Sequence, residues 1–310
     1  MKILSRFTKR GLIVCLSIYV VFLFGNSVFA QGKGSDPLEL TFAVLPQEVS
    51  AMSAEMYQPL INYIAEKTGK KVAFYMTTSY AAEVEAMIGG FIDIARLGPT
   101  SYVIGRDRDP NIEVFAVQYA APGIVAKGGS GYYGCLVTAK GGKYDSIEKL
   151  RGTILALTDP QSTSGYLVPK VFFPEEKLGG EPLEKYFGKI VFVGMHDAAM
   201  LAVHEGRVDA AFTNDSNMER LIAKGVIKKE SFNFLWWSKE IVGDAFAWRK
   251  NLKSELKEKI KEAFLTFLPG KVKGADKFMK DSAILRYAEA QDNIYDPVRK
   301  LLEAQKKMKK

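Results

Sequence analysis

The sequence predicts an α/β fold with two lobes, in which short buried strands alternate with helices that cross over to the next strand. Two observations support this class. Apolar runs of strand length are each followed by a polar turn and a helical pattern, and this alternation appears once before Pro99 and again after Tyr144. A chain of 310 residues that is 47% apolar can bury two cores of ordinary size; one large domain is the alternative.

The first group of elements starts after Leu38. Its apolar runs predict three strands, at 40–45, 71–76 and 91–97. Apolar side chains at helical spacing predict two helices between them, at 54–68 and 80–88. Glycine follows each helix and supplies its stop, at Gly69 and at Gly89.

The second group repeats this order. Three further strands are predicted, at 153–157, 190–193 and 208–212, and a polar turn and a helical pattern follow each of them. Two charged amphipathic helices, at 254–267 and 297–308, complete the chain and are expected to pack on the outside. Because no proline-rich linker separates the groups, we expect the chain to pass between the lobes more than once.

The first thirty residues have the three parts of a cleavable signal peptide: a basic start, an apolar run and small residues before a polar stretch. The apolar run, Gly11–Phe24, is shorter than the roughly 20 residues of a membrane-spanning helix. We expect residues 1–30 to be the signal peptide, with cleavage after Ala30 and a periplasmic mature protein. Cys15 leaves with this segment, so Cys135 has no partner for an internal disulfide.

Much of the net positive charge comes from the predicted signal peptide. The formal net charge is +8, and removing the four basic residues of the signal peptide leaves about +4. The remaining excess lies largely in the tail, at Lys306, Lys307, Lys309 and Lys310. We interpret these lysines as a solvated helix end and expect no nucleic-acid partner.

Five polar turns follow predicted strands, at 77–80, 98–102, 161–165, 194–197 and 213–216. In open α/β sheets, ligands bind beyond the carboxyl ends of the strands, so we expect these turns to line one cleft. The alternative is helix capping, because Ser, Thr, Asp and Asn are also the preferred capping residues. Capping explains Ser162–Ser164 less well, because a helix cap uses one hydroxyl group and this turn has three in a row. With Gly165 giving close access to the backbone, this turn suits a tetrahedral oxyanion.

The segment Asp159–Pro169 resembles the most specific motif of the periplasmic phosphonate-binding proteins of ABC importers, the phosphate/phosphite/phosphonate-binding family. The likeness continues through four further segments, at 80–81, 131–133, 194–198 and 243–252. It implies a type II periplasmic-binding-protein fold: two α/β lobes, joined by two crossover hinge strands, with a ligand cleft between them. The expected boundaries are 38–136 plus 243–310 for lobe 1 and 137–242 for lobe 2. The implied partners are a small phosphorus oxyanion and an ABC permease in the membrane, and a monomer is expected.

The resemblance also implies the ligand-binding residues. Seven positions match those of the family: Tyr80, Tyr132, Ser162, Thr163, Ser164, His196 and Asp244. The three hydroxyl residues would bind the oxyanion, the tyrosines would enclose it from lobe 1, and the histidine would donate from lobe 2 and pair with the anion when protonated. Asp244 would accept a hydrogen bond from a ligand that still carries a P–OH group. Hydroxyl groups and helix amides can satisfy the anion without any arginine.

One neighbourhood departs from the family pattern. Members that bind aminoalkylphosphonates carry a glutamate just after the strand that matches 208–212, where it holds the ligand's amine. This chain has Asn214, Asp215, Ser216 and Asn217 there. Asp215 would replace the glutamate only from an adjacent position, which changes its direction. Phosphite or a small alkylphosphonate is therefore favoured over an aminoalkylphosphonate.

The sequence leaves two alternative binding functions open and gives little support to an enzyme. A binding module that feeds a membrane sensor would use the same cleft, and a binder of another small oxyanion would use the same turn chemistry. An enzyme is not expected, because the mature chain has one cysteine and two histidines, and a Ser164–His196 pair would need an acid to orient the histidine. No cofactor and no metal are expected.

Overall fold

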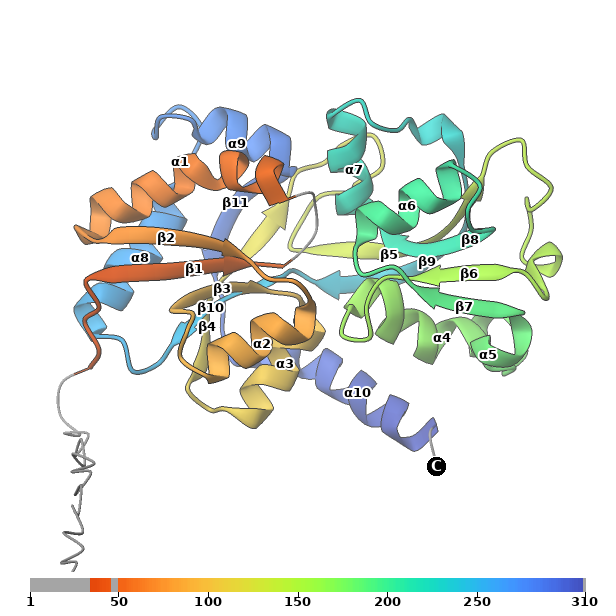
Figure 1. The fold of residues 1–310 in the computed structure, drawn as a ribbon, viewed down its shortest axis with the longest axis horizontal. Helices are drawn as coiled ribbons and strands as arrows, with labels where there is room; N and C mark the ends of the chain where they lie inside the picture. Colours follow the sequence, from red (N-terminus) through yellow and green to blue (C-terminus); the bar gives the residue numbers. More distant parts are fainter. Residues whose placement is uncertain (1–33, 46–49, 309–310) are drawn as a thin grey trace, which may run out of the picture. The chain divides into compact units, whose positions relative to one another are not determined.

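The computed structural model describes residues 34–45 and 50–308, and the chain from Gly34 onward forms one compact unit. Its strands form two separate sheets, each with helices on both faces (Figure 1). We call the part around the six-stranded sheet the first lobe and the part around the five-stranded sheet the second lobe. The predicted signal peptide, 1–30, lies outside the described residues.

The sheet of the first lobe combines a parallel and an antiparallel half. Its strands, in order across the sheet, are β11 (Ile284–Glu289), β4 (Ile112–Ala120), β10 (Ala245–Arg249), β3 (Ile94–Leu97), β1 (Glu39–Val44) and β2 (Lys71–Met76). β2, β1 and β3 are parallel, and the other three strands join through antiparallel pairs. No strand is predicted at β11 from the sequence, because this edge strand buries only Ile284 and Tyr287 well and shows no clear alternation.

Helices pack on both faces of this sheet. They are α1 (Ser50–Thr68), α8 (Ser254–Thr266) and α9 (Ala275–Ser282) on one face, and α2 (Tyr80–Ile88) and α3 (Pro99–Arg108) on the other. On the first face Phe264 packs edge-on against Phe42 and Phe115. The helix predicted at 80–88 is α2 with the same bounds, and Ser79 caps it by accepting a hydrogen bond from the Ala82 N–H at 3.1 Å.

The second lobe has the same layered build. Its strands, in order, are β7 (Lys189–Phe192), β6 (Ile154–Leu157), β8 (Ala210–Asn214), β5 (Gly131–Ala139) and β9 (Phe232–Val242). Its helices are α4 (Val168–Lys177) and α5 (Leu183–Tyr186) on one face, and α6 (His196–His204) and α7 (Asp215–Ala223) on the other. Phe173, Phe212 and Trp236 form an edge-to-face cluster under α4. The strands predicted at 153–157, 190–193 and 208–212 correspond to β6, β7 and β8. These three strands are parallel, as helical crossovers between them require.

Two short crossovers connect the sheets. The first, 121–130, links β4 to β5, and the second, Gly243 and Asp244, links β9 to β10. They lie against each other, since a Cβ added to Gly243 would lie 2.9 Å from the Gln118 carbonyl oxygen and 3.2 Å from that of Ser130. Only glycine fits this close approach without displacement of the neighbouring chain.

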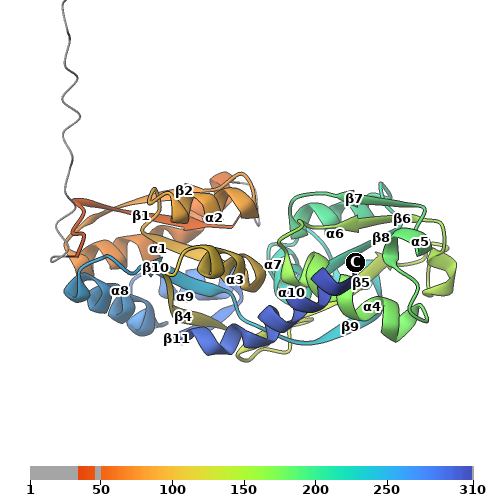
Figure 2. The ribbon, with the colours of Figure 1, turned by 90° about the horizontal axis from the view of Figure 1, so that it is seen from below.

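The lobe boundaries differ from the expected ones at two places. The expected boundary at 136/137 falls inside β5, which pairs with β8 and β9 of the second sheet along its length, so the first lobe ends before Gly131. The second difference is α10 (Asp296–Met308), which contacts α3 of the first lobe and α4 of the second (Figure 2). Its Val298 belongs to a core of the first lobe, and Leu301 packs against cores of both lobes. The C-terminal helix is therefore a third link between the lobes.

Candidate ligand-binding site

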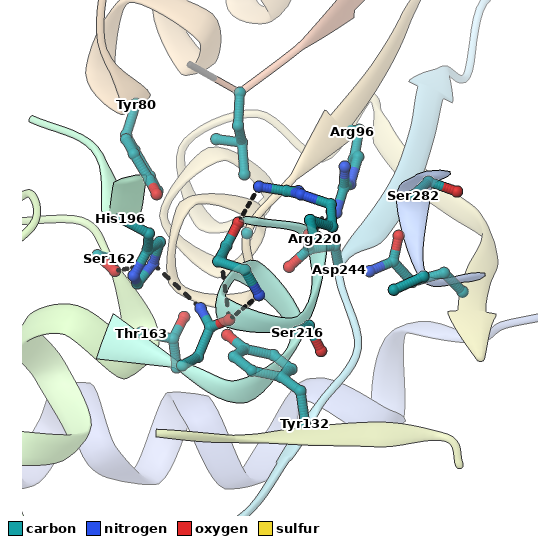
Figure 3. Close-up of a pocket in the computed structure, with 16 residues that line it drawn as sticks. Tyr80, Arg96, Tyr132, Ser162, Thr163, His196, Ser216, Arg220, Asp244 and Ser282 are labelled. Atoms are coloured by element: carbon teal, nitrogen blue, oxygen red, sulfur yellow. Dashed lines mark hydrogen bonds and ion pairs between the residues drawn. The ribbon is translucent and has the colours of Figure 1, made fainter. Parts of the chain in front are cut away.

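A small cavity lies between the two lobes, with a volume of about 30 Å³, which is room for roughly two or three water molecules. Each of the five polar turns contributes lining residues: Tyr80, Gly98, Ser162, Thr163, His196, Asn214 and Ser216. Tyr132 of β5 and Asp244 of the second crossover also line it (Figure 3). The carboxyl ends of the strands of both sheets therefore converge on one cavity, as the sequence predicts.

Six of the eight predicted site residues line this cavity, and Ser164 and Asp215 do not. The Ser164 hydroxyl accepts a hydrogen bond from the Asn214 side-chain amide at 3.1 Å. The Asp215 carboxylate accepts from the backbone N–H groups of Tyr133, at 2.9 Å, and Ser216, at 2.8 Å. Both side chains thus hold parts of the second lobe together.

The turn at Ser162 combines capping with access to the cavity. The Ser162 hydroxyl accepts from the Gly165 N–H at 3.1 Å and so caps the single wide turn Thr163–Leu167, which continues into α4. Gly165 does not give a ligand access to the backbone. A Cβ there would lie 2.1 Å from the Thr158 hydroxyl oxygen, so the space beside this glycine belongs to Thr158.

Thr163 joins the two lobes at the edge of the cavity. Its hydroxyl oxygen accepts a hydrogen bond from the Thr100 N–H at 2.9 Å and lies 2.8 Å from the Thr100 hydroxyl, which belongs to α3 of the first lobe. Beside it, the Ser101 hydroxyl donates to the Gln161 side-chain oxygen at 3.2 Å. Thr100 and Ser101, at the start of α3, therefore bind across the cleft to the second lobe, and the residue before α3, Gly98, makes no side-chain cap.

His196, the first residue of α6, is held among hydrogen-bonding groups of the second lobe. Its Nε2 lies 3.3 Å from the Ser162 hydroxyl, and its Nδ1 lies 3.2 Å from the Thr213 hydroxyl. Burial lowers the pKa of His196 to about 3, and the nearby Arg220 charge acts in the same direction. The imidazole is neutral at neutral pH, so it can act as a hydrogen-bonding group and not as a cation.

Two arginines line the cavity beside the hydroxyl groups and helix ends that the sequence indicates. Arg96, at the carboxyl end of β3, donates to one carboxylate oxygen of Asp244 from Nε at 3.1 Å and from Nη2 at 2.9 Å. Arg220 extends from α7. With His196 neutral, the charged lining residues are two arginines and one aspartate, which gives the cavity a formal charge of +1.

Asp244 is engaged by the first lobe. Its partner is Arg96, while the nearby Arg249 pairs with Asp93. Selection of a P–OH proton by Asp244 stays a prediction. A charged residue inside the predicted strand 91–97 was a signal for Arg96, whereas nothing in the helical pattern that contains Arg220 marks it.

The two tyrosines complete the set of donors. Both are buried, and burial raises the pKa of the Tyr80 and Tyr132 hydroxyl groups, with the Asp244 carboxylate acting in the same direction. They therefore stay protonated and able to donate. Further lining residues that no motif marks are Leu45, Gln118, Asn217, Ser282 and Ala283. Within 34–45 and 50–308 no group of His, Cys, Asp or Glu is arranged to hold a metal ion.

The fold and this site define a class: a binding protein of two α/β lobes that encloses a small anion between the ends of its strands. A family model described as "ABC transporter, phosphonate, periplasmic substrate-binding protein" matches residues 42–295. The chain belongs to this family, as its resemblance predicts. It is a substrate-binding component of an importer and not an enzyme. None of the helices in the described ranges has the length and apolar character to span a bilayer.

Two curated relatives agree with this assignment. The chain is 33% identical over 236 residues to the phosphate-import protein PhnD of Mycolicibacterium smegmatis, a match that covers 74% of this chain and 71% of that protein. It is 30% identical over 233 residues to the phosphonates-binding periplasmic protein of Escherichia coli, which covers 74% and 66%.

Solved structures confirm the predicted two-lobed periplasmic-binding-protein fold. The binding component of an ABC phosphonate transporter from Pseudomonas aeruginosa matches with a TM-score of 0.77 and 28% identity, over 87% of each chain. PhnD1 from Prochlorococcus marinus, solved in complex with methylphosphonate, matches with a TM-score of 0.75 over 86% of this chain and 97% of that one. At 19% identity this second likeness concerns the fold alone.

Proposed function

We propose that this protein captures a small phosphorus oxyanion in the periplasm and delivers it to a membrane ABC permease, with phosphite or a small alkylphosphonate favoured over an aminoalkylphosphonate. Export by the signal peptide 1–30 and action as a monomer belong to the same proposal. The observation that carries it is the cavity between the lobes, which is small, has a formal charge of +1 and is lined by hydroxyl groups. Family membership favours import over the sensor alternative.

The size and chemistry of the cavity support the ligand class. A volume of about 30 Å³ suits the smallest phosphorus oxyanions better than ones with long substituents. A desolvated anion needs hydrogen bonds on each oxygen or a balancing charge. Ser162, Thr163 and His196 offer polar groups from the second lobe, and Tyr80 and Arg96 offer donors from the first.

A ligand that bonds to both lobes would stabilise the closed arrangement, and the permease would recognise that arrangement. The names of the relatives fit this role: one is a phosphate-import protein and another is a phosphonates-binding protein. For this chain, Asp215 holds the Tyr133 N–H and does not reach the cavity, which supports a ligand without an amine.

Isothermal titration of the purified, ligand-stripped protein against phosphite, methylphosphonate, 2-aminoethylphosphonate, phosphate and sulfate tests this function. We expect phosphite or methylphosphonate to bind most tightly. Ser162→Ala should weaken that binding about tenfold, because a hydrogen bond to a charged group is lost. The control is Ser254→Ala, an exposed serine of α8 outside the cavity, which should change nothing. Tightest binding of 2-aminoethylphosphonate would contradict the ligand choice, and no binding of any phosphorus anion would contradict the function.

A further inference from the structure

The first crossover, 121–130, forms a loop whose base belongs to the first lobe. Ala120, the last residue of β4, donates its N–H to the Gly129 carbonyl at 2.8 Å and accepts from the Gly129 N–H at 3.0 Å. The Ala121 N–H donates at 2.8 Å to the carbonyl of Ala283, which follows α9. These bonds attach both ends of the loop to the first lobe.

The tip of the same loop, residues 123–127, is held by the second lobe. One carboxylate oxygen of Glu219, on α7, accepts hydrogen bonds from the Val125 N–H at 2.7 Å and from the Ala126 N–H at 3.2 Å. The Val125 side chain packs against an apolar core of the second lobe. The loop therefore spans from one lobe to the other and is attached to both.

The tip is shaped to receive the Glu219 side chain. A Cβ added to Gly123 would lie 2.6 Å from the Glu219 oxygen that accepts both bonds, so glycine leaves the room that this carboxylate occupies. Lys229, also of the second lobe, donates to the Ile124 carbonyl at 3.2 Å. Glu219 is only 9% exposed, and a shielded carboxylate that lost its donors would be costly. We therefore expect the tip to stay with the second lobe when the lobes move.

We propose that Glu219 is a positioning residue for closure of the cleft. It does not line the cavity itself, but it attaches the crossover to α7, whose Ser216 and Arg220 do (Figure 3). Because the base and the tip are both held, bending of this crossover is confined to the residues between them, Pro122 and Gly128. A confined pivot returns the lobes to the one arrangement that forms the cavity. This inference rests on the proposed function.

The test combines two measurements. Isothermal titration gives the affinity for phosphite, and double electron–electron resonance gives the distribution of lobe-to-lobe distances. The spin labels are placed at Glu66→Cys on α1 of the first lobe and at Lys185→Cys on α5 of the second, two exposed positions. Cys135 is fully buried and should stay unlabelled.

Glu219→Ala should weaken phosphite binding about fivefold and broaden the distances of the phosphite-bound protein, because ordering the lobes then costs more of the binding free energy. Glu219→Gln should stay within about threefold of the wild type, since its amide oxygen accepts the same bonds. Gly123→Ala should resemble Glu219→Ala. The double variant should bind no more weakly than Glu219→Ala, because the added methyl group then meets no carboxylate. The control is Glu205→Ala, which removes an exposed carboxylate that pairs with Arg207.

Failure of this inference can be told apart from failure of the proposed function. An unchanged affinity or an unchanged distance distribution in Glu219→Ala would overturn the role of Glu219, even if the variant unfolds more easily. Losses that simply add in the double variant would overturn it as well. If Glu219→Ala does not fold, an unchanged affinity in Gly123→Ala has the same meaning. If the wild-type protein binds no phosphorus anion, the proposed function fails, and equal ligand-free distance distributions in the wild type and Glu219→Ala would overturn the positioning role separately.

Discussion

At the scale of single residues, burial decides what each side chain of the cavity can do. His196 is 3% exposed, and the imidazole has four polar neighbours but no carboxylate partner among the hydrogen bonds that the described residues make to its ring. Burial therefore keeps it neutral, with its pKa at about 3. The unfolded chain lacks this constraint, and its histidine titrates near 6.5.

The unfolding free energy should consequently fall as the pH is lowered from about 6.5 toward 3. In this window the unfolded chain binds a proton at residue 196 and the folded chain does not, so acid favours unfolding. The contribution is about 1.4 kcal/mol per pH unit, or about 2 kcal/mol at pH 5 relative to pH 7.5. Urea unfolding of the wild-type protein and of His196→Gln at both pH values measures it. An equal loss of stability in the two proteins would contradict the lowered pKa.

The cavity shows what a sequence can and cannot reveal about single residues. Ser162 and Thr163 are neighbours in one sequence motif, so the sequence alone identifies them as lining residues. Arg96 and Arg220 come from different lobes, on β3 and α7, and only the folded chain brings them to one cavity. Asp215 shows the opposite case. It belongs to the turn after β8 that the sequence correctly marks, but its carboxylate points toward the backbone of β5 and not into the cavity.

At the scale of elements, the turn between β6 and α4 depends on one close contact. Gly165 packs against Thr158 at the end of β6, and the Thr158 hydroxyl lies 3.3 Å from the Nδ1 of His196. Thr158 therefore connects the end of β6 both to the turn before α4 and to the first residue of α6.

Gly165→Ala should therefore destabilise the protein by about 1–3 kcal/mol, as overpacking of a buried site does. Its Cβ would lie 2.5 Å from the Cβ of Thr158, so the turn that carries Ser162 has to shift. Denaturant unfolding and phosphite titration together measure the loss of stability and of affinity. Gly142→Ala is the control, since that glycine is exposed in a loop and its nearest neighbour would be 3.3 Å away. Equal behaviour of both variants would show that the turn tolerates the added methyl group.

The elements that the sequence predicts best are those with a complete local signal. α2 and β2 have the predicted bounds, because each combines an apolar pattern with a clear stop. β11 was missed because its stability comes from pairing with β4, a contact across most of the chain. The first crossover was placed too late for the same reason: Cys135 lies fully buried in the middle of β5, and only its pairing with β8 and β9 assigns that strand to the second sheet.

At the scale of the whole described unit, the lobes meet across the cleft through Thr100 and Thr163. Thr100→Val keeps the side-chain volume and removes the hydroxyl, while Thr163 and the other lining residues stay in place. The closed arrangement loses about 1 kcal/mol, so the affinity for phosphite should fall about fivefold through a smaller closed population.

Titration calorimetry together with lobe-to-lobe distances from fluorescence energy transfer measures this change. The matched control is Thr266→Val, whose hydroxyl contacts Tyr63 within the first lobe at 3.0 Å. An unchanged affinity in Thr100→Val would show that this contact does not contribute to closure.

α10 adds a different kind of connection to these polar contacts. Leu301 packs against apolar cores of both lobes, so separating the lobes has to uncover part of this apolar surface. Exposing apolar surface raises the heat capacity. The free-energy cost of this exposure falls on cooling and rises in salts such as sulfate, which are excluded from the protein surface. The balance between open and closed forms of this protein is therefore tied to the solvent as well as to the ligand: cold favours opening, and salting-out conditions favour closing.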